Sequence, residues 1–250
     1  MAKLDKSKYT PNEWQDLQAQ RKQYKIKRRA EKASKRAAKS ITTTETLEKT
    51  QIKQKYSTAF VLGNGTSRKP VMVEHLSKLG NTYGCNALYR MFAPDYLVAV
   101  DVKMVLEITK TGYQRKHNLW TNPNKAYTRI EDLNTFNPSK GWSSGPTALW
   151  LASQHGYDRI YILGFDYKGL VQGSKFNNMY ADTPNYKKSQ DGATFFGNWL
   201  RQTVSVIKEH KNIQYIRVIA PDNYCPEELN KISNFTTITV EDFMKIYQLT

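Results

Sequence analysis

Short apolar segments that alternate with segments of helical spacing constrain the fold of this chain more than any other feature. Strands are predicted for five apolar runs, at residues 57–62, 82–86, 95–101, 159–163 and 213–220. Helices are predicted between and after them, at residues 71–79, 103–108, 146–155, 194–210 and 241–247. This alternation predicts an α/β fold with a doubly wound, mostly parallel, Rossmann-like sheet that is covered on both faces.

Polar residues follow several of the predicted strands. Asn64 follows the first, Asn86 the second and Asp101 the third, and Phe165 and Asp166 follow a later one. In a sheet of this kind ligands bind beyond the carboxyl ends of the strands, where the strand order reverses. The sequence therefore predicts one ligand site built from these strand ends.

A polar turn between the first strand and the next helix is the first candidate part of that site. It consists of Gly63, Asn64, Gly65, Thr66 and Ser67. Its glycines allow close backbone approach, and its amides and hydroxyls are typical of an anion site. The spacing matches neither a Walker A loop nor a complete GxGxxG motif. We expect a phosphate or nucleotide contact here, and an ordinary tight turn is the alternative.

A second turn rich in hydroxyls precedes the helix predicted at 146–155. It contributes Ser143, Ser144, Gly145 and Thr147. One of the serines alone could serve as an N-cap. Two such turns in one α/β sheet favour a ligand that carries both a phosphate and a sugar.

Carboxylates provide the candidate acid–base groups. Asp101 and Asp166 end apolar strands, where they could bind a ribose hydroxyl, a metal or a proton, or could cap a helix. Apolar residues do not recur in residues 169–191 at the spacing of a helix or a strand. This predicts a long loop that either closes as a lid over a polar ligand or simply extends into solvent. In this segment Asp182 is the predicted general base, with Tyr180 and Lys187 near a phosphate.

The chain's net charge of +16 is concentrated near its start. Residues 1–55 hold 16 Lys and Arg but six Asp and Glu. We divide the chain into a basic helical arm at 1–40, a linker at 41–56 and a nucleotide-binding catalytic domain at 57–250. A soluble tail, a nucleic-acid-binding arm and contact with an anionic membrane surface all fit such an arm. As a nucleic-acid arm it would act through Arg21, Lys22, Lys25, Lys27, Arg28, Arg29, Lys32, Lys35 and Arg36.

Several protein classes are not expected. The sequence has no apolar run of membrane-spanning length and no secretory signal pattern, so we expect no membrane partner. Two cysteines do not make a disulfide scaffold, which favours a cytoplasmic protein. The four histidines are far apart, so no metal site is expected.

Three blocks resemble the bacterial sialyltransferases of glycosyltransferase family 42 and the related domain of hydroxymethylpterin pyrophosphokinases. The blocks lie at residues 61–67, 85–86 and 144–166, within about residues 57–220. Together with Tyr180, Ala181, Asp182 and Thr183, these blocks also resemble uncharacterised proteins of tailed bacteriophages. If a phage encodes the protein, the expected location is the cytoplasm of the host cell.

The resemblance implies roles for particular residues. Asn64 and Asn86 would contact the nucleotide of the donor, and Ser144 and Gly145 would bind near it. The turn reads Gly-Thr-Ser instead of the family's Gly-Pro-Ser, and Lys140 is nearest to its arginine before the second turn. The family has its catalytic histidine in the region that lies between His155 and His210 here, and this region contains no histidine. We therefore expect Asp182 or Asp166 to act as the general base. Tyr167 and Tyr180 match the family's phosphate-binding tyrosines approximately.

The leading hypothesis is a glycosyltransferase that uses a nucleotide sugar and requires no cofactor. The acceptor of the sugar would be a hydroxyl group. The basic arm suggests that this hydroxyl belongs to nucleic acid, for example to a modified base in phage DNA. One alternative is a Mg²⁺-dependent pyrophosphoryl or nucleotidyl transferase with Asp101 and Asp166 as ligands. The other is a nucleic-acid-binding protein without catalysis.

Overall fold

The computed structural model describes residues 57–222 and 224–249. The predicted arm at 1–40, with all its Lys and Arg residues, and the linker at 41–56 lie outside the described residues.

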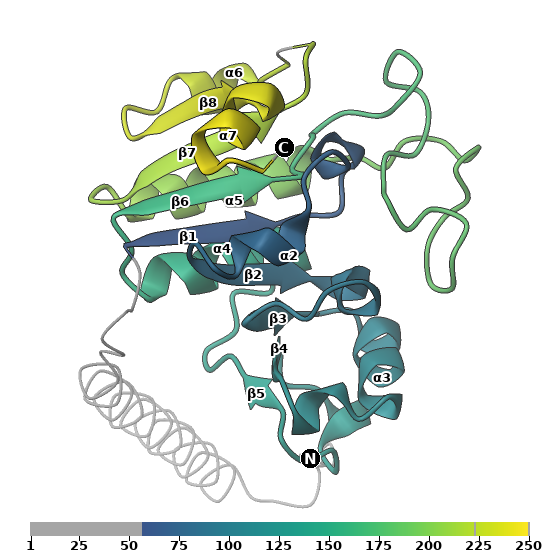
Figure 1. Cartoon of the computed structure of the whole chain (residues 1–250). Coiled ribbons are helices and arrows are strands. Elements are labelled where there is room, and N and C mark those ends of the chain that lie inside the picture. Colours follow the sequence, from purple (N-terminus) through teal and green to yellow (C-terminus); the bar gives the residue numbers. More distant parts are fainter. Residues whose placement is uncertain (1–56, 223, 250) are drawn as a thin grey trace, which may run out of the picture. The chain divides into compact units, whose positions relative to one another are not determined.

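The strands form a single eight-stranded sheet in which all neighbours run parallel, as Figure 1 shows. Their order across the sheet is β5-β4-β3-β2-β1-β6-β7-β8. They are β1 (Thr58–Leu62), β2 (Asn81–Cys85), β3 (Tyr96–Val98), β4 (Asn118–Thr121), β5 (Asn134–Thr135), β6 (Arg159–Leu163), β7 (Gln214–Ile219) and β8 (Phe235–Thr239). The strand order reverses between β1 and β6, which confirms the predicted doubly wound α/β fold.

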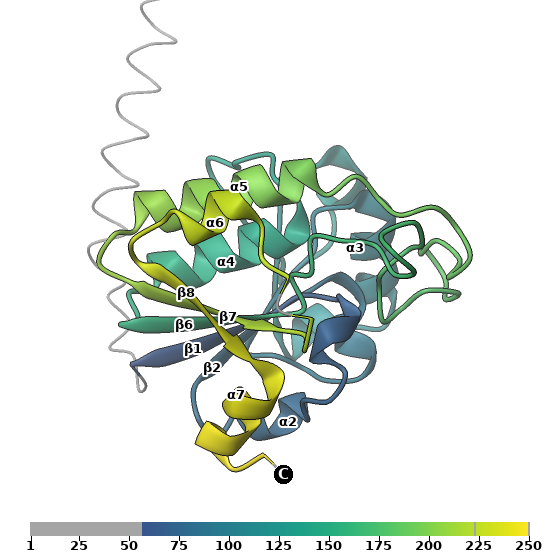
Figure 2. The same ribbon diagram turned by 90° about the horizontal axis from the view of Figure 1, so that it is seen from above.

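Helices cover both faces of this sheet. In Figure 2, α4, α5 and α6 lie on one face, and α2 and α7 lie on the other. The helices are α2 (Val73–Leu76), α3 (Val102–Lys110), α4 (Ser144–Gln154), α5 (Gly197–Glu209), α6 (Glu227–Asn230) and α7 (Val240–Tyr247). Short 3-10 helices are η2 (Thr66–Arg68), η3 (Asn86–Arg90), η4 (Tyr113–Arg115) and η5 (Lys125–Tyr127).

The side chains of β1 alternate between two buried clusters, one on each face. Ala59 and Val61 pack with residues of α4 and α5, whereas Phe60 and Leu62 pack with residues of α2, α3 and α7. All four are fully buried. Burial on both faces explains why this strand appears in the sequence as a continuous apolar run.

Some elements differ from the predictions. The strand predicted at 95–101 is only three residues long, and the helix predicted at 71–79 contracts to the single turn of α2. Strands β4, β5 and β8 and helix α6 were not predicted. Within residues 57–222 and 224–249, no helix has the length and apolar character needed to cross a membrane.

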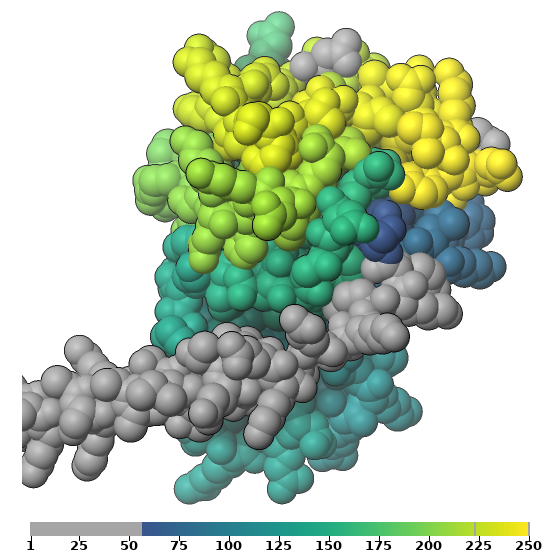
Figure 3. All heavy atoms as spheres, turned by 90° about the vertical axis from the view of Figure 1, so that its left-hand side faces the viewer, coloured from purple at the N-terminus to yellow at the C-terminus, as the bar shows by residue number. Residues whose placement is uncertain are grey.

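The carboxyl ends of the strands and a long loop lie at the same end of the sheet. Figure 1 shows this loop, residues 169–191, projecting in green beyond the arrowheads of the strands. It contains no helix or strand. A bridge between Leu170 and Lys175 closes a short turn at its start, and a bridge between Lys175 and Gly192 joins the two ends of the rest of the loop. Figure 3 views the sheet from its opposite end, where the green residues of α5 lie beside the yellow C-terminal segments.

Candidate functional site

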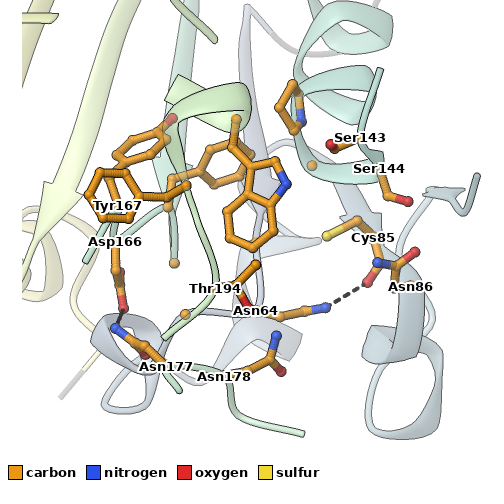
Figure 4. A pocket seen from close by; sticks show the side chains of 18 of the residues that line it. Asn64, Cys85, Asn86, Ser143, Ser144, Asp166, Tyr167, Asn177, Asn178 and Thr194 are labelled. Carbon is orange, nitrogen blue, oxygen red and sulfur yellow. Dashed lines mark hydrogen bonds between the residues drawn. The ribbon is translucent and has the colours of Figure 1, made fainter. Parts of the chain in front are cut away.

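A pocket of about 570 Å³ opens at the carboxyl ends of the central strands, beside the first turn of α4. The turn after β1, the residues after β2, β3, β4 and β6, and part of the 169–191 loop line it. The predicted residues among them are Gly63, Asn64, Gly65, Asn86, Asp101, Ser143, Ser144, Gly145, Phe165 and Asp166. Figure 4 shows Asn64, Asn86 and Ser144 around this hollow, so residues far apart in the sequence form one site.

Asn64 is held in the pocket wall with its side-chain oxygen unpaired. The residue is 7% exposed, and its Nδ2 donates to the Cys85 carbonyl over 3.2 Å and to the Tyr186 hydroxyl over 3.3 Å. Because the Cys85 carbonyl accepts but cannot donate, Oδ1 must face away from it. This buried Oδ1 has no partner among the described residues. An unpaired buried acceptor is costly, which points to a ligand donor at this position.

Two more side-chain amide oxygens in the lining, those of Asn86 and Asn122, are also buried and unpaired within the described residues. Asn86 follows β2 in the left-handed conformation, with φ of 51°, and Asn122 follows β4. Their buried Oδ1 atoms also lack a partner in the described part of the chain. Asn122 was not predicted, because β4 itself was not.

Asp101 follows β3 as the N-cap of α3, and its side chain is exposed. Its carboxylate does not cap the helix, so the capping alternative is wrong for this residue. The carboxylate lies in the pocket lining and accepts no hydrogen bond from the residues that the structure describes.

Four of the five main-chain amides of the Gly63–Ser67 turn are bonded within the protein and are not available to an anion. Gly63 N donates to the Leu163 carbonyl over 2.8 Å, and Gly65 N donates to the Gly164 carbonyl over 2.9 Å. A Cβ on Gly63 would lie 2.5 Å from the Gly164 carbonyl oxygen, so this glycine permits the close approach of the two turns. The predicted phosphate contact through the amides of Gly63 and Gly65 is wrong, because the carbonyls at the end of β6 and in the turn after it occupy these two amides.

Thr66 and Ser67 are likewise bonded within the protein and do not line this pocket. The amide and hydroxyl of Thr66 donate to Asn177 Oδ1 over 3.0 and 2.9 Å. Ser67 donates its amide to Asp166 Oδ2 over 3.1 Å and its hydroxyl to Asp166 Oδ1. Both side chains therefore hold the loops together and are not free to bind a ligand.

Asp166 lies in the pocket wall, but its carboxylate is occupied. Besides the two bonds from Ser67, Oδ2 accepts from Asn177 Nδ2 over 2.9 Å (Figure 4). The residue is 8% exposed. It joins the turn after β1 to the long loop, which makes it a positioning residue and a poor base.

The first turn of α4 provides the free backbone donors of the site. Ser143 N donates to Gln202 Oε1 over 3.1 Å, and Pro146 has no N–H. No acceptor for the amides of Ser144 and Gly145 lies in the described part of the chain. These two N–H groups and the positive end of the helix dipole are suited to an anion.

The hydroxyls of Ser144 and Thr147 differ in their use. Ser144 Oγ accepts from Val100 N over 3.1 Å, which leaves its own O–H able to donate. Thr147 is 2% exposed and donates to the Ser143 carbonyl over 2.8 Å. Thr147 does not line the pocket, so its predicted contact with a ligand is wrong.

Aromatic rings and one cation complete the lining. The rings are Trp142, Phe165, Tyr167, Phe176, Phe196 and Trp199. Phe165 was predicted as a binding residue, and the resemblance implied an approximate match of Tyr167 to a phosphate-binding tyrosine. Lys168 is the one Lys, Arg or His among the described residues that line the pocket. Burial lowers the pKa of its ammonium, which forms an ion pair with Asp222 in an adjoining pocket of about 470 Å³.

The loop at 169–191 brings different residues to the site from those predicted. Asn177 and Asn178 line the pocket, and Met179 N donates to the Asn64 carbonyl over 2.8 Å. Asp182 is exposed and outside the pocket, with a pKa lowered by the hydrogen bond from Ser189 N. The structure therefore removes Asp182 from the site.

Tyr180 is buried beneath the same loop and does not line the pocket. Its hydroxyl accepts from Arg68 Nη2 over 3.4 Å. A direct contact of Tyr180 with a ligand in this pocket is accordingly excluded in this arrangement.

Of Asp101 and Asp166, the pair predicted as metal ligands under the Mg²⁺-dependent alternative, Asp166 already accepts hydrogen bonds at both carboxylate oxygens. The residues that the structure describes contain no group of three or more His, Cys, Asp or Glu suited to a metal. Comparison with family models, curated proteins and solved structures found no match to this chain.

Proposed function

We propose that this protein is a glycosyltransferase that binds a nucleotide-activated sugar in the 570 Å³ pocket and transfers the sugar to an acceptor hydroxyl. The single observation that carries the proposal is the convergence of Asn64, Asn86 and Ser144 on one hollow. That hollow lies where the strand order reverses, which is the usual ligand position in open α/β sheets.

The pocket offers separate surroundings for the parts of such a donor. The free amides of Ser144 and Gly145 suit the phosphate, whose charge Lys168 can also offset. Phe165, Phe196 and Trp199 supply apolar and aromatic surface for a nucleobase. When the bond from sugar to phosphate breaks, the negative charge that develops on the phosphate is stabilised at the start of α4.

Asp101 is the residue that we assign as the general base. It is the carboxylate of the pocket whose oxygens are not already engaged by neighbouring side chains. It would take the proton from the acceptor hydroxyl as that oxygen attacks the anomeric carbon and the nucleotide leaves. The Mg²⁺-dependent alternative has weaker support, because its second ligand, Asp166, is occupied.

For the acceptor we propose a hydroxyl on nucleic acid, on the ground of charge. The chain has a net charge of +16, and the excess of Lys and Arg is greatest in residues 1–55. Such an excess favours binding to phosphate backbones through counterion release. A modified base in phage DNA is the acceptor that agrees with the sequence resemblance.

Calorimetric titration of the full chain with UDP-, GDP-, CMP- and dTDP-sugars tests the donor. We expect one nucleotide class to bind, and Asn86→Ala to weaken it by about tenfold because a buried ligand contact is lost. Transfer is then followed by mass spectrometry of hydroxymethylated DNA. The proposal fails if no nucleotide sugar binds, or if ATP with Mg²⁺ binds in their place.

A further inference from the structure

Four acceptor-bearing side chains follow four neighbouring strands of the sheet. Asn64 follows β1, Asn86 follows β2, Asp101 follows β3 and Asn122 follows β4, and all four line the pocket. Neighbouring strands are about 4.8 Å apart, so the side chains form a row of roughly 14 Å. We call these four residues the acceptor row.

The row presents oxygens that lack donors. The Oδ1 atoms of the three asparagines are buried and unpaired within the described part, and Asn64 as a whole is 93% buried. The orientation of Asn64 is fixed by the Cys85 carbonyl, so the oxygen and not the nitrogen is left over. A ligand rich in O–H or N–H donors would satisfy all of these atoms at once.

Charge in the pocket is divided between two sides. The row carries a negative charge at Asp101 and three negative dipole ends, while the cation Lys168 lies after β6, on the other side of β1. The phosphate-binding amides lie at the start of α4. A carboxylate on the sugar would therefore face Asp101 and unpaired oxygens with no cation among them, which is a repulsive arrangement.

Resting on the proposed function, we propose that the acceptor row binds the sugar of the donor and selects neutral polyhydroxylated sugars over acidic ones. The hydroxyl groups of the neutral sugar donate hydrogen bonds to the side-chain oxygens of Asn64, Asn86 and Asn122 and to the Asp101 carboxylate. An acidic sugar loses one of these donors and places its charge against Asp101.

Matched donors that differ by one carboxylate test the selection. The full chain is titrated with UDP-glucose against UDP-glucuronate, with GDP-mannose against GDP-mannuronate, and with UDP and GDP alone. For the nucleotide that the protein accepts, we expect the neutral sugar to bind at least about tenfold more tightly than the acidic one. In Asp101→Asn that ratio should fall to about threefold or less, because the opposing charge is gone.

Two further variants guard against indirect effects. Glu74→Gln removes an exposed carboxylate of α2 outside the pocket and should leave the ratio unchanged, although the net charge changes equally. Asn122→Ala should weaken the neutral donor by about tenfold but the nucleotide alone by less than twofold. The melting temperature of each variant shows that it is folded.

The outcomes separate the two proposals. If the nucleotide sugars bind but the acidic member binds equally well or better, the selection is wrong and the nucleotide-sugar site stands. An unchanged ratio in Asp101→Asn also overturns the selection. If no nucleotide sugar binds, the proposed function fails, and the role of the acceptor row fails with it.

Discussion

The side-chain amide of Asn64 donates to the main-chain carbonyl of Cys85 over 3.2 Å and thereby joins the ends of β1 and β2. This bond determines which way the amide faces, and it leaves the Asn64 oxygen unpaired in the pocket wall. One residue thus both holds two strand ends together and leaves an unpaired acceptor in the pocket wall.

Asn64→Ala is expected to affect both roles. It leaves the Cys85 carbonyl without its donor, so the free energy of unfolding should fall by about 1–2 kcal/mol. Affinity for the nucleotide sugar should fall by at least about tenfold, because the pocket contact is also lost. Urea denaturation and calorimetry measure the two effects. Asn124→Ala, at an exposed residue outside the pocket, is the control, and equal donor affinity in both variants would contradict the assignment.

Asp101 and Asp182 provide a matched pair of exposed carboxylates. Asp101→Asn should lower the rate of transfer by about 10²–10⁴-fold, because the general base is removed. Asp182→Asn should keep the rate within about twofold, since Asp182 lies outside the pocket. The measurement is kcat at saturating donor. Full activity of Asp101→Asn together with loss in Asp182→Asn would restore the base predicted from the sequence.

Lys168→Met is expected to weaken the binding of phosphate-bearing ligands. Lys168 is the cation of the described lining, so affinity for the nucleotide should fall by about tenfold, while affinity for the nucleoside should hardly change. Lys175→Met is the control, because the Lys175 ammonium donates to the Gln190 carbonyl and does not line the pocket. An equal loss for nucleoside and nucleotide would show that Lys168 does not contact phosphate.

His155 should make the stability of the fold depend on pH. Burial lowers its pKa to about 4, and its Nδ1 is 2.5 Å from the Tyr83 hydroxyl. A folded-state pKa below the unfolded value of 6.5 means that the unfolded state takes up the proton first. Stability from this group is full above about pH 6.5 and declines as the pH falls toward 4, by on the order of 3 kcal/mol.

Urea denaturation between pH 7.5 and 4 measures this effect against His155→Gln. The variant should lose less stability over that range, because glutamine does not titrate. Parallel curves for the two proteins would show that His155 does not contribute to the pH dependence.

The sequence predicts those parts of the fold that depend on local patterns. β1 and β6 contain continuous apolar runs and β7 is mostly apolar, and the positions of all three agree with the predictions within two residues. β5 has two residues and β8 (FTTIT) is half polar, so neither carries a pattern of its own. These strands exist because the neighbouring strand pairs with them.

The same distinction between local patterns and distant contacts decides which residues of the candidate site could be predicted. Asn64, Asn86 and Asp101 are identifiable because each follows an apolar run, whereas Asn122 follows the short strand β4, which was missed. The amides of Thr66 and Ser67 seemed free because their partners, Asn177 and Asp166, are 111 and 99 residues away. Whether a donor is free depends on such distant contacts, which local sequence does not reveal.

A crystal structure of the full chain with the nucleotide sugar that binds most tightly tests the central claim most directly. The account predicts the nucleotide sugar in the pocket between Asn64, Asn86 and Ser144, with a phosphate oxygen about 3 Å from the amides of Ser144 and Gly145. A nucleotide bound elsewhere on the protein, with this pocket still holding only water, would contradict it.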